Sequence, residues 1–142
     1  GVVAIVCPKN YPFIAFITLV FGAIGMGNTV VVLPSEDSPL VALDMCQIFE
    51  TSDLPNGVVN IITGKTRELT RILAEHGGVD SIWCFGDQDT SNIVESLSIS
   101  NLKQTWVNNG LDYDWYDDDQ VAGNNILRKA TQVKNIWIPY GD

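Results

Sequence analysis

Short β-branched runs alternate with longer apolar or amphipathic runs along most of the chain. We predict strands at residues 1–7, 28–33, 58–63, 81–85 and 102–107, because each run is rich in Val, Ile or Thr and is bounded by turn residues. The longer runs between them predict helices at residues 12–26, 39–50, 66–76 and 89–97. This alternation is typical of an α/β fold, a doubly wound parallel sheet of five strands.

The pattern changes after Asn108. Five Asp residues lie among three aromatic residues between positions 112 and 119, and we interpret residues 112–125 as an acidic linker whose aromatic side chains could pack on the domain. Residues 121–131 predict a short helix. Residues 133–139 predict an extra strand that joins the sheet edge or lies against another chain. We therefore divide the chain into a domain at 1–111, the linker, and a C-terminal helix and strand at 126–142.

Composition narrows the class of function. A length of 142 residues suits one buried core, and the net charge of −9 argues against nucleic acid and anionic membrane surfaces. The longest apolar stretch, residues 11–26, is too short to span a membrane. Cys7, Cys46 and Cys84 form no CxxC pair, so we expect no metal site and a reducing, cytoplasmic location. The chain opens with Gly1 directly on a strand, which suggests a fragment of a longer protein.

Parallel α/β sheets bind ligands just beyond the carboxyl ends of their strands, here residues 8–10, 33–36, 64–67, 85–87 and 108–110. Neither GxGxxG nor GxxxxGK[ST] occurs there, so the common phosphate-binding fingerprints are absent. Asp87 is placed to cap the fourth helix. His76 ends the third helix, where we expect it to act as a favourable charge or donor.

Several motifs in order carry a resemblance to a known family. They are PKNYPF (8–13), GNTVVVLPSE (27–36), LPNGVVNIITG (54–64), FG (85–86) and NLK (101–103). Together they resemble the NAD-binding, Rossmann-like domain of aldehyde dehydrogenases over residues 1–111. Residues 130–139 resemble the terminal oligomerisation strand of the same family. Among subtypes, the chain is most similar to the degenerate C-terminal copy of the family-16 type.

The resemblance implies a cofactor site that is only partly kept. Glu36 matches the carboxylate that binds a ribose hydroxyl of NAD, although it could equally be a first-turn acid of a helix. Gly64 and Gly86 complete the implied cofactor-binding residues. Leu33 stands where the family has a ribose-binding Lys, and Asp87 stands where it has a Ser that receives the pyrophosphate. Both changes argue against NAD.

The resemblance also implies a lost reaction. Asn10 matches the family's oxyanion-hole Asn, although a loop Asn that bonds neighbouring backbone is an equal alternative. Asn108 replaces the general-base Glu, and an amide cannot take up a proton near neutral pH. The catalytic domain with its nucleophilic Cys, which the family inserts after the position of Gly110, is replaced by the acidic linker. We therefore expect no catalytic residues in this chain.

Three functions remain open. The first is a non-catalytic structural or interaction module, a pseudoenzyme that packs against another aldehyde dehydrogenase-type domain or forms a homo-oligomer. The second is a weak NAD-binding module without turnover. The third is a part of an NAD-dependent aldehyde oxidoreductase whose active site lies elsewhere in the polypeptide. We expect no bound cofactor in the first case, and the resemblance leaves NAD as the one candidate.

Overall fold

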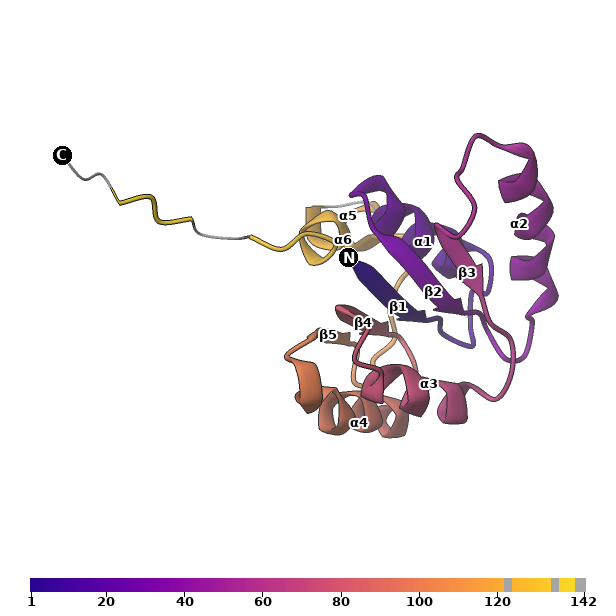
Figure 1. Cartoon of the computed structure of the whole chain (residues 1–142). Coiled ribbons are helices and arrows are strands. Elements are labelled where there is room, and N and C mark those ends of the chain that lie inside the picture. The colour runs from indigo at the N-terminus through magenta and orange to yellow at the C-terminus, as the bar shows by residue number, and fades with distance from the viewer. Residues whose placement is uncertain (122–123, 134–135, 140–142) are drawn as a thin grey trace.

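The structure is a computed structural model and describes residues 1–121, 124–133 and 136–139. Within these residues five parallel strands form one sheet in the order β3-β2-β1-β4-β5 (Figure 1). They are β1 (Val2–Val6), β2 (Thr29–Leu33), β3 (Val59–Ile61), β4 (Ser81–Cys84) and β5 (Gln104–Val107). The predicted Rossmann-like α/β sheet is confirmed, with each strand somewhat shorter than predicted.

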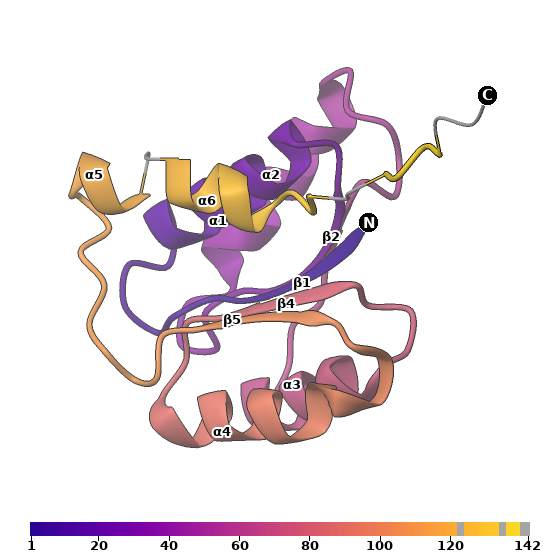
Figure 2. The ribbon, with the colours of Figure 1, turned by 90° about the vertical axis from the view of Figure 1, so that its left-hand side faces the viewer.

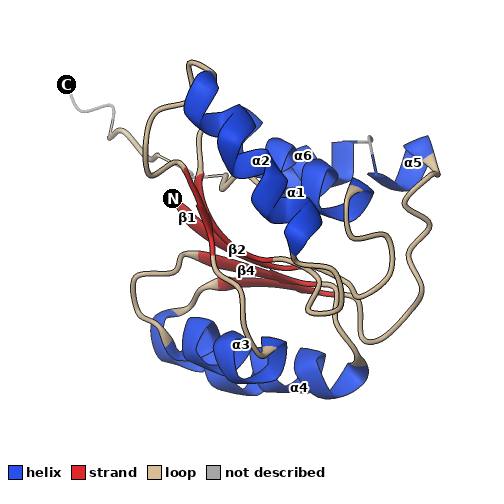
Figure 3. Ribbon diagram, turned by 90° about the vertical axis from the view of Figure 1, so that its right-hand side faces the viewer, coloured by secondary structure: helices blue, strands red, loops and turns tan. Residues whose placement is uncertain are grey.

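Helices on both faces connect these strands. They are α1 (Ile14–Gly25), α2 (Leu40–Thr51), α3 (Thr66–Glu75) and α4 (Gln88–Leu97), the last followed by the 3₁₀ helix η1 (Ser98–Asn101). Helices α1 and α2 cover one face, and α3 and α4 cover the other (Figures 2 and 3). The chain winds outward from β1 to β3 and then crosses back to β4 and β5. The winding direction therefore reverses between β1 and β4, where open α/β sheets bind ligands.

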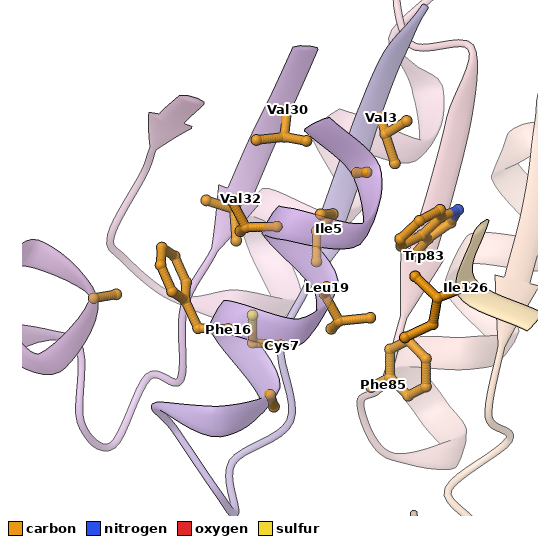
Figure 4. Close-up of a cluster of buried hydrophobic side chains, with 14 of the residues drawn as sticks. Val3, Ile5, Cys7, Phe16, Leu19, Val30, Val32, Trp83, Phe85 and Ile126 are labelled. Carbon is orange, nitrogen blue, oxygen red and sulfur yellow. The ribbon is translucent and has the colours of Figure 1, made fainter. Parts of the chain in front are cut away.

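Two hydrophobic cores sandwich the sheet, because successive strand side chains point to opposite faces. The larger core lies beneath α1 (Figure 4) and includes Val3, Ile5, Phe16, Leu19, Val30, Val32, Trp83 and Phe85. The smaller core lies beneath α3 and α4 and includes Ala4, Val6, Leu33, Ile82, Cys84 and Val94. The continuous apolar strands of the sequence thus reflect burial on both faces. No helix in the described ranges has the length and apolarity that a membrane crossing requires.

The C-terminal region differs from the predicted linker and helix. Trp115 is almost fully buried in the larger core, and Tyr113 Oη donates to the carbonyl of Gln120 at 2.7 Å. In place of one helix at residues 121–131 there are two short ones, α5 (Asp118–Val121) and α6 (Asn124–Lys129), and residues 122–123 between them lie outside the described residues. The acidic segment therefore leads into α5 at Asp118, and its Trp115 packs in the core, in line with the prediction that its aromatic side chains could pack on the domain.

Helix α6 packs on α1 through a close contact. A side chain at Gly22 would collide with Ile126, so the missing Cβ lets the two helices approach. Asn28 Nδ2 donates to the carbonyl of Ala130 at 2.8 Å and holds the end of this segment beside β2. The predicted strand at 133–139 includes residues 134–135, which lie outside the described residues. Its described part, Val133 and residues 136–139, forms no strand within this chain and leads away from the sheet (Figure 1).

Candidate functional site

A cavity of about 750 Å³ opens at the carboxyl ends of the strands, at the reversal between β1 and β4. The loops after β1, β4 and β5, the start of α3 and the segment 111–115 form its walls. The residues predicted from the sequence that line it are Asn10, Glu36, Gly86, Asp87 and Asn108. The topology therefore brings most of the predicted site residues together, as a strand-end site requires.

Leu33 and Gly64 do not line this cavity. Leu33 is 2% exposed and belongs to the core beneath α3 and α4, so the position expected for a ribose-binding cation is part of the hydrophobic interior. Gly64 has a φ of +154°, and an added Cβ would lie 3.0 Å from Leu69 Cδ1. Its conformation and packing account for glycine at this position without a cofactor.

Glu36 links the loop after β2 to the start of α3. Its Oε2 accepts a hydrogen bond from the backbone N–H of Thr66 at 2.9 Å. Hydrogen bonds from Thr66 hold the pKa of this exposed carboxyl below its usual value, and Lys9 and Lys65 act in the same direction. Glu36 is thus an acid at a helix start, as one alternative predicted, but the helix is α3 rather than the sequence-adjacent α2.

Asp87 is the N-cap of α4, as predicted. Its Oδ1 accepts from the backbone N–H of Thr90 at 2.8 Å and also from the Thr90 hydroxyl. These bonds lower the pKa of the carboxyl, with Lys9 and Arg67 adding to the effect. Gly86 precedes it, and a Cβ there would lie 3.1 Å from that of Thr90. The carboxylate therefore occupies the helix start that faces the cavity.

Asn108 holds the position of the expected general base. Its Nδ2 donates to the carbonyl of Leu111 at 2.8 Å, and its Oδ1 is buried without a partner among the described residues. The amide thus folds back on its own loop. Asn10, in contrast, is exposed at the cavity wall next to Tyr11, which has a φ of 58°. The Asn10 side chain therefore lines the cavity and is open to solvent.

Sequence reasoning missed two features of the cavity. Cys7, at the end of β1, lines it, yet burial raises the pKa of its thiol far above neutrality, so the thiolate form is disfavoured. Tyr113 and Trp115 form a wall against Phe85, with ring centroids 5.3 and 5.1 Å from that ring. The one sequence signal for this wall was the presence of aromatic residues among the Asp residues of the acidic segment.

Acidic groups outnumber basic groups around the cavity. The acidic lining residues are Glu36, Asp87, Asp112 and Asp114, and the basic ones are Lys9 and Arg67. Two of the carboxylates already accept backbone N–H groups at the starts of α3 and α4. No group of three His, Cys, Asp or Glu side chains among the described residues could hold a metal ion. The ionisable side chains that line the cavity therefore carry more negative than positive charge.

Comparisons with known proteins agree on one family. The family model described as "Aldehyde dehydrogenase family" matches residues 1–111. The NADP/NAD-dependent aldehyde dehydrogenase PuuC of Escherichia coli is 32% identical over 111 residues, which is 78% of this chain and 22% of that protein. Rat aldehyde dehydrogenase 1A1 is 35% identical over 105 residues, 73% of this chain and 21% of that protein.

Solved structures give the same result. A mutant of aldehyde dehydrogenase C from Pseudomonas syringae, in complex with NAD+ and octanal, superposes with a TM-score of 0.72 at 34% identity. Gamma-glutamyl-gamma-aminobutyraldehyde dehydrogenase from Burkholderia cenocepacia superposes with a TM-score of 0.69 at 38% identity. Each match covers 75% of this chain and 22% of the other. The chain therefore spans between about a fifth and a quarter of the length of the proteins compared with it.

Proposed function

Because this chain belongs to the aldehyde dehydrogenase family, we propose that it is a non-catalytic structural or interaction module of a larger aldehyde dehydrogenase-like protein. The observation that carries the proposal is the Asp87 carboxylate on the α4 N-terminus, inside the cavity where the family resemblance expects a pyrophosphate. A carboxylate there uses the backbone N–H of Thr90 and repels a diphosphate at the same time.

The remaining residues do not fit a bound dinucleotide well. Leu33 lies in the core and offers no cation, and Oε2 of Glu36 is engaged by Thr66. The acidic side chains Asp112 and Asp114 add negative charge to the rim. A diphosphate would meet this charge with only Lys9 and Arg67 to offset it.

The chemistry for aldehyde oxidation is also missing from the described residues. Cys7 is the cysteine in the cavity, and its buried thiol has a raised pKa. Burial also raises the pKa of Cys84 to about 11, and its side chain belongs to the smaller core. Asn108 has no proton-accepting group near neutral pH. Among the described residues that line the cavity, position 108 therefore carries no carboxylate base, and the one cysteine is a buried thiol.

The C-terminal tail supports an interaction role. Ile136 and Trp137 are 83% and 92% exposed, and neither packs on this chain. Large apolar side chains in a row on the surface mark contact sites for other proteins. We propose that this tail pairs with a second subunit or with another aldehyde dehydrogenase-type domain, as the terminal strand of the family suggests.

Calorimetric titration with NAD tests the cofactor part of the proposal. We expect neither saturable heat nor a thermal shift at millimolar NAD. Asp87→Ser should allow weak binding to appear, because serine removes the negative charge and remains a good N-cap. Saturable binding of NAD by the unmodified chain would refute the proposal that the cavity does not bind NAD.

Light scattering after size exclusion tests the interaction part. We expect self-association of the 142-residue chain, or association with an aldehyde dehydrogenase domain of the parent protein, to be lost when Ile136 and Trp137 are changed to Ser. Ile99→Ser in η1, where the side chain is 73% exposed, is the matched control and should change nothing. The interaction role would be overturned if the chain stayed monomeric under all conditions and did not bind an aldehyde dehydrogenase domain of the parent protein.

One observation favours weak NAD binding as the second candidate. The hydrogen bond from Thr66 engages only Oε2 of Glu36, and the carboxylate is exposed, so its other oxygen could accept from a ribose hydroxyl. The same NAD titration tests whether Glu36 accepts from the ribose, with Glu36→Gln as the diagnostic variant. If the active site lies elsewhere in the polypeptide, aldehyde oxidation by the parent protein should survive Asp87→Ser and Asn108→Ala in this segment.

A further inference from the structure

A second hollow, separate from the cavity at the strand ends, lies between α6 and the β4–β5 side of the sheet. Its volume is about 490 Å³. Ser81 and Trp83 of β4 line it together with Trp106 of β5, and the register pairs Trp83 with Trp106. Arg128 and Lys129 of α6 also line it. Its residues therefore come from both the sheet and the C-terminal helix.

Two buried polar groups in this hollow lack a partner. Trp83 is fully buried and Ser81 is 7% exposed. Among the described residues, neither Nε1 of Trp83 nor Oγ of Ser81 has a hydrogen-bond partner. The indole nitrogen lies on the side of Trp83 that faces away from Ile5 and Leu19 (Figure 4). An indole N–H can only donate, so the group that satisfies it must be an acceptor.

Two cationic side chains line the same hollow as these donors. Arg128 and Lys129 are neighbours at the end of α6, and Lys129 Nζ lies 5.9 Å from the centroid of the Trp106 ring. Neither forms an ion pair within the described part of the chain, whereas Lys65 and Arg71 on α3 do. In a chain of net charge −9, this places positive charge beside unpaired donors. This combination favours a ligand that is both a hydrogen-bond acceptor and an anion.

We propose that this hollow binds a carboxylate carried on a flat apolar body. The carboxylate oxygens accept from Trp83 Nε1 and Ser81 Oγ, Arg128 and Lys129 balance the charge, and the apolar body packs on the Trp106 ring. The site shares no residue with the cavity at the strand ends. It is therefore independent of whether that cavity binds a dinucleotide.

Benzoate is the probe, and benzamide is its uncharged counterpart. We titrate each into the ¹⁵N-labelled 142-residue chain and follow the indole N–H resonance of Trp83 after sequential assignment. Benzoate should shift this resonance in a saturable way at millimolar concentration, and benzamide should not. Dilution of the protein without benzoate tests whether a second copy of the chain supplies the carboxylate. In that case the Trp83 indole N–H resonance should shift with protein concentration, whereas a carboxylate from a small molecule gives no such dependence.

Paired variants test the role of charge. Arg128→Gln with Lys129→Gln should weaken benzoate binding by about fivefold or more, as expected for the loss of two exposed ion pairs. Lys65→Gln with Arg71→Gln changes the net charge equally on α3 and should leave binding unchanged. Equal shifts with benzoate and benzamide, equal weakening in both double variants, or no shift of Trp83 in any titration or dilution would each overturn the proposal.

Discussion

Replacing Asp87 by Ala tests whether this carboxylate stabilises the fold. The change removes the hydrogen bonds from the Thr90 N–H and hydroxyl, and Thr90 is only 6% exposed. Loss of an N-cap costs about 1 kcal/mol, and loss of a negative charge at a helix start adds about 0.3–1 kcal/mol. We therefore expect the free energy of unfolding to fall by about 1.5–2 kcal/mol, and Tm to fall by about 5–8 °C.

Urea denaturation of three variants separates the contributions. Asp87→Asn keeps a good N-cap and loses the charge, so it should cost only about 0.5 kcal/mol. Asp89→Ala removes an exposed acid from the first turn of the same helix and should stay within about 0.5 kcal/mol of the parent. If Asp87→Ala is no more destabilising than Asp89→Ala, Asp87 does not stabilise α4 as an N-cap.

The loss of stability caused by Asp87→Ala should depend on pH in a definite direction. Hydrogen bonds from Thr90 lower the pKa of Asp87 in the folded state below the ordinary value of 3.8. The stabilisation by the ionised carboxyl is therefore fully present above the unfolded-state pKa and is lost as the pH falls through the folded-state pKa. The difference in stability between parent and variant should narrow below about pH 4. A difference that stays constant down to about pH 3 would contradict this reasoning.

Three further predictions concern packing and the tail. Gly22→Ala should destabilise the chain by about 1–3 kcal/mol in urea denaturation. It should add little to the cost of Ile126→Ala, which removes the colliding atoms but itself leaves a cavity in the core. Lys103→Met should cost about 2–3 kcal/mol in the same assay, because Lys103 Nζ donates to three carbonyls at the end of α3, whereas Lys65→Met should cost little. Trp137→Ser should leave the free energy of unfolding within about 0.5 kcal/mol of the parent while reducing association measured by light scattering.

The positions of the strands along the chain were predictable because β-branched runs and turn residues are local signals. The Asp87 cap was predictable for the same reason, since an N-cap acts on an amide three residues away. Glu36 shows the limit of such reasoning. Its partner, Thr66, is 30 residues away and is adjacent only because β2 and β3 are parallel neighbours.

The end of α3 shows the same limit. We expected His76 to act there as a charge or donor, but its Nδ1 accepts from the N–H of Gly78 at 3.0 Å. The side-chain donor to carbonyls at the end of α3 is Lys103, which lies immediately before β5 and is 8% exposed. A buried lysine with carbonyl partners is invisible in a sequence pattern that treats lysine as a surface residue.

In the function that we propose, the contacts that stabilise the two helix starts are also those that disfavour a dinucleotide. In the cavity, Asp87 and Glu36 supply acceptors to N–H groups at the starts of α4 and α3. A phosphate bound at a helix start would need the same kind of donors. If the chain does not bind a cofactor, as we propose, a side chain at such a position can be selected for stability alone. A serine at position 87 should therefore lower stability slightly and raise affinity for phosphate-containing ligands, because one contact decides both properties.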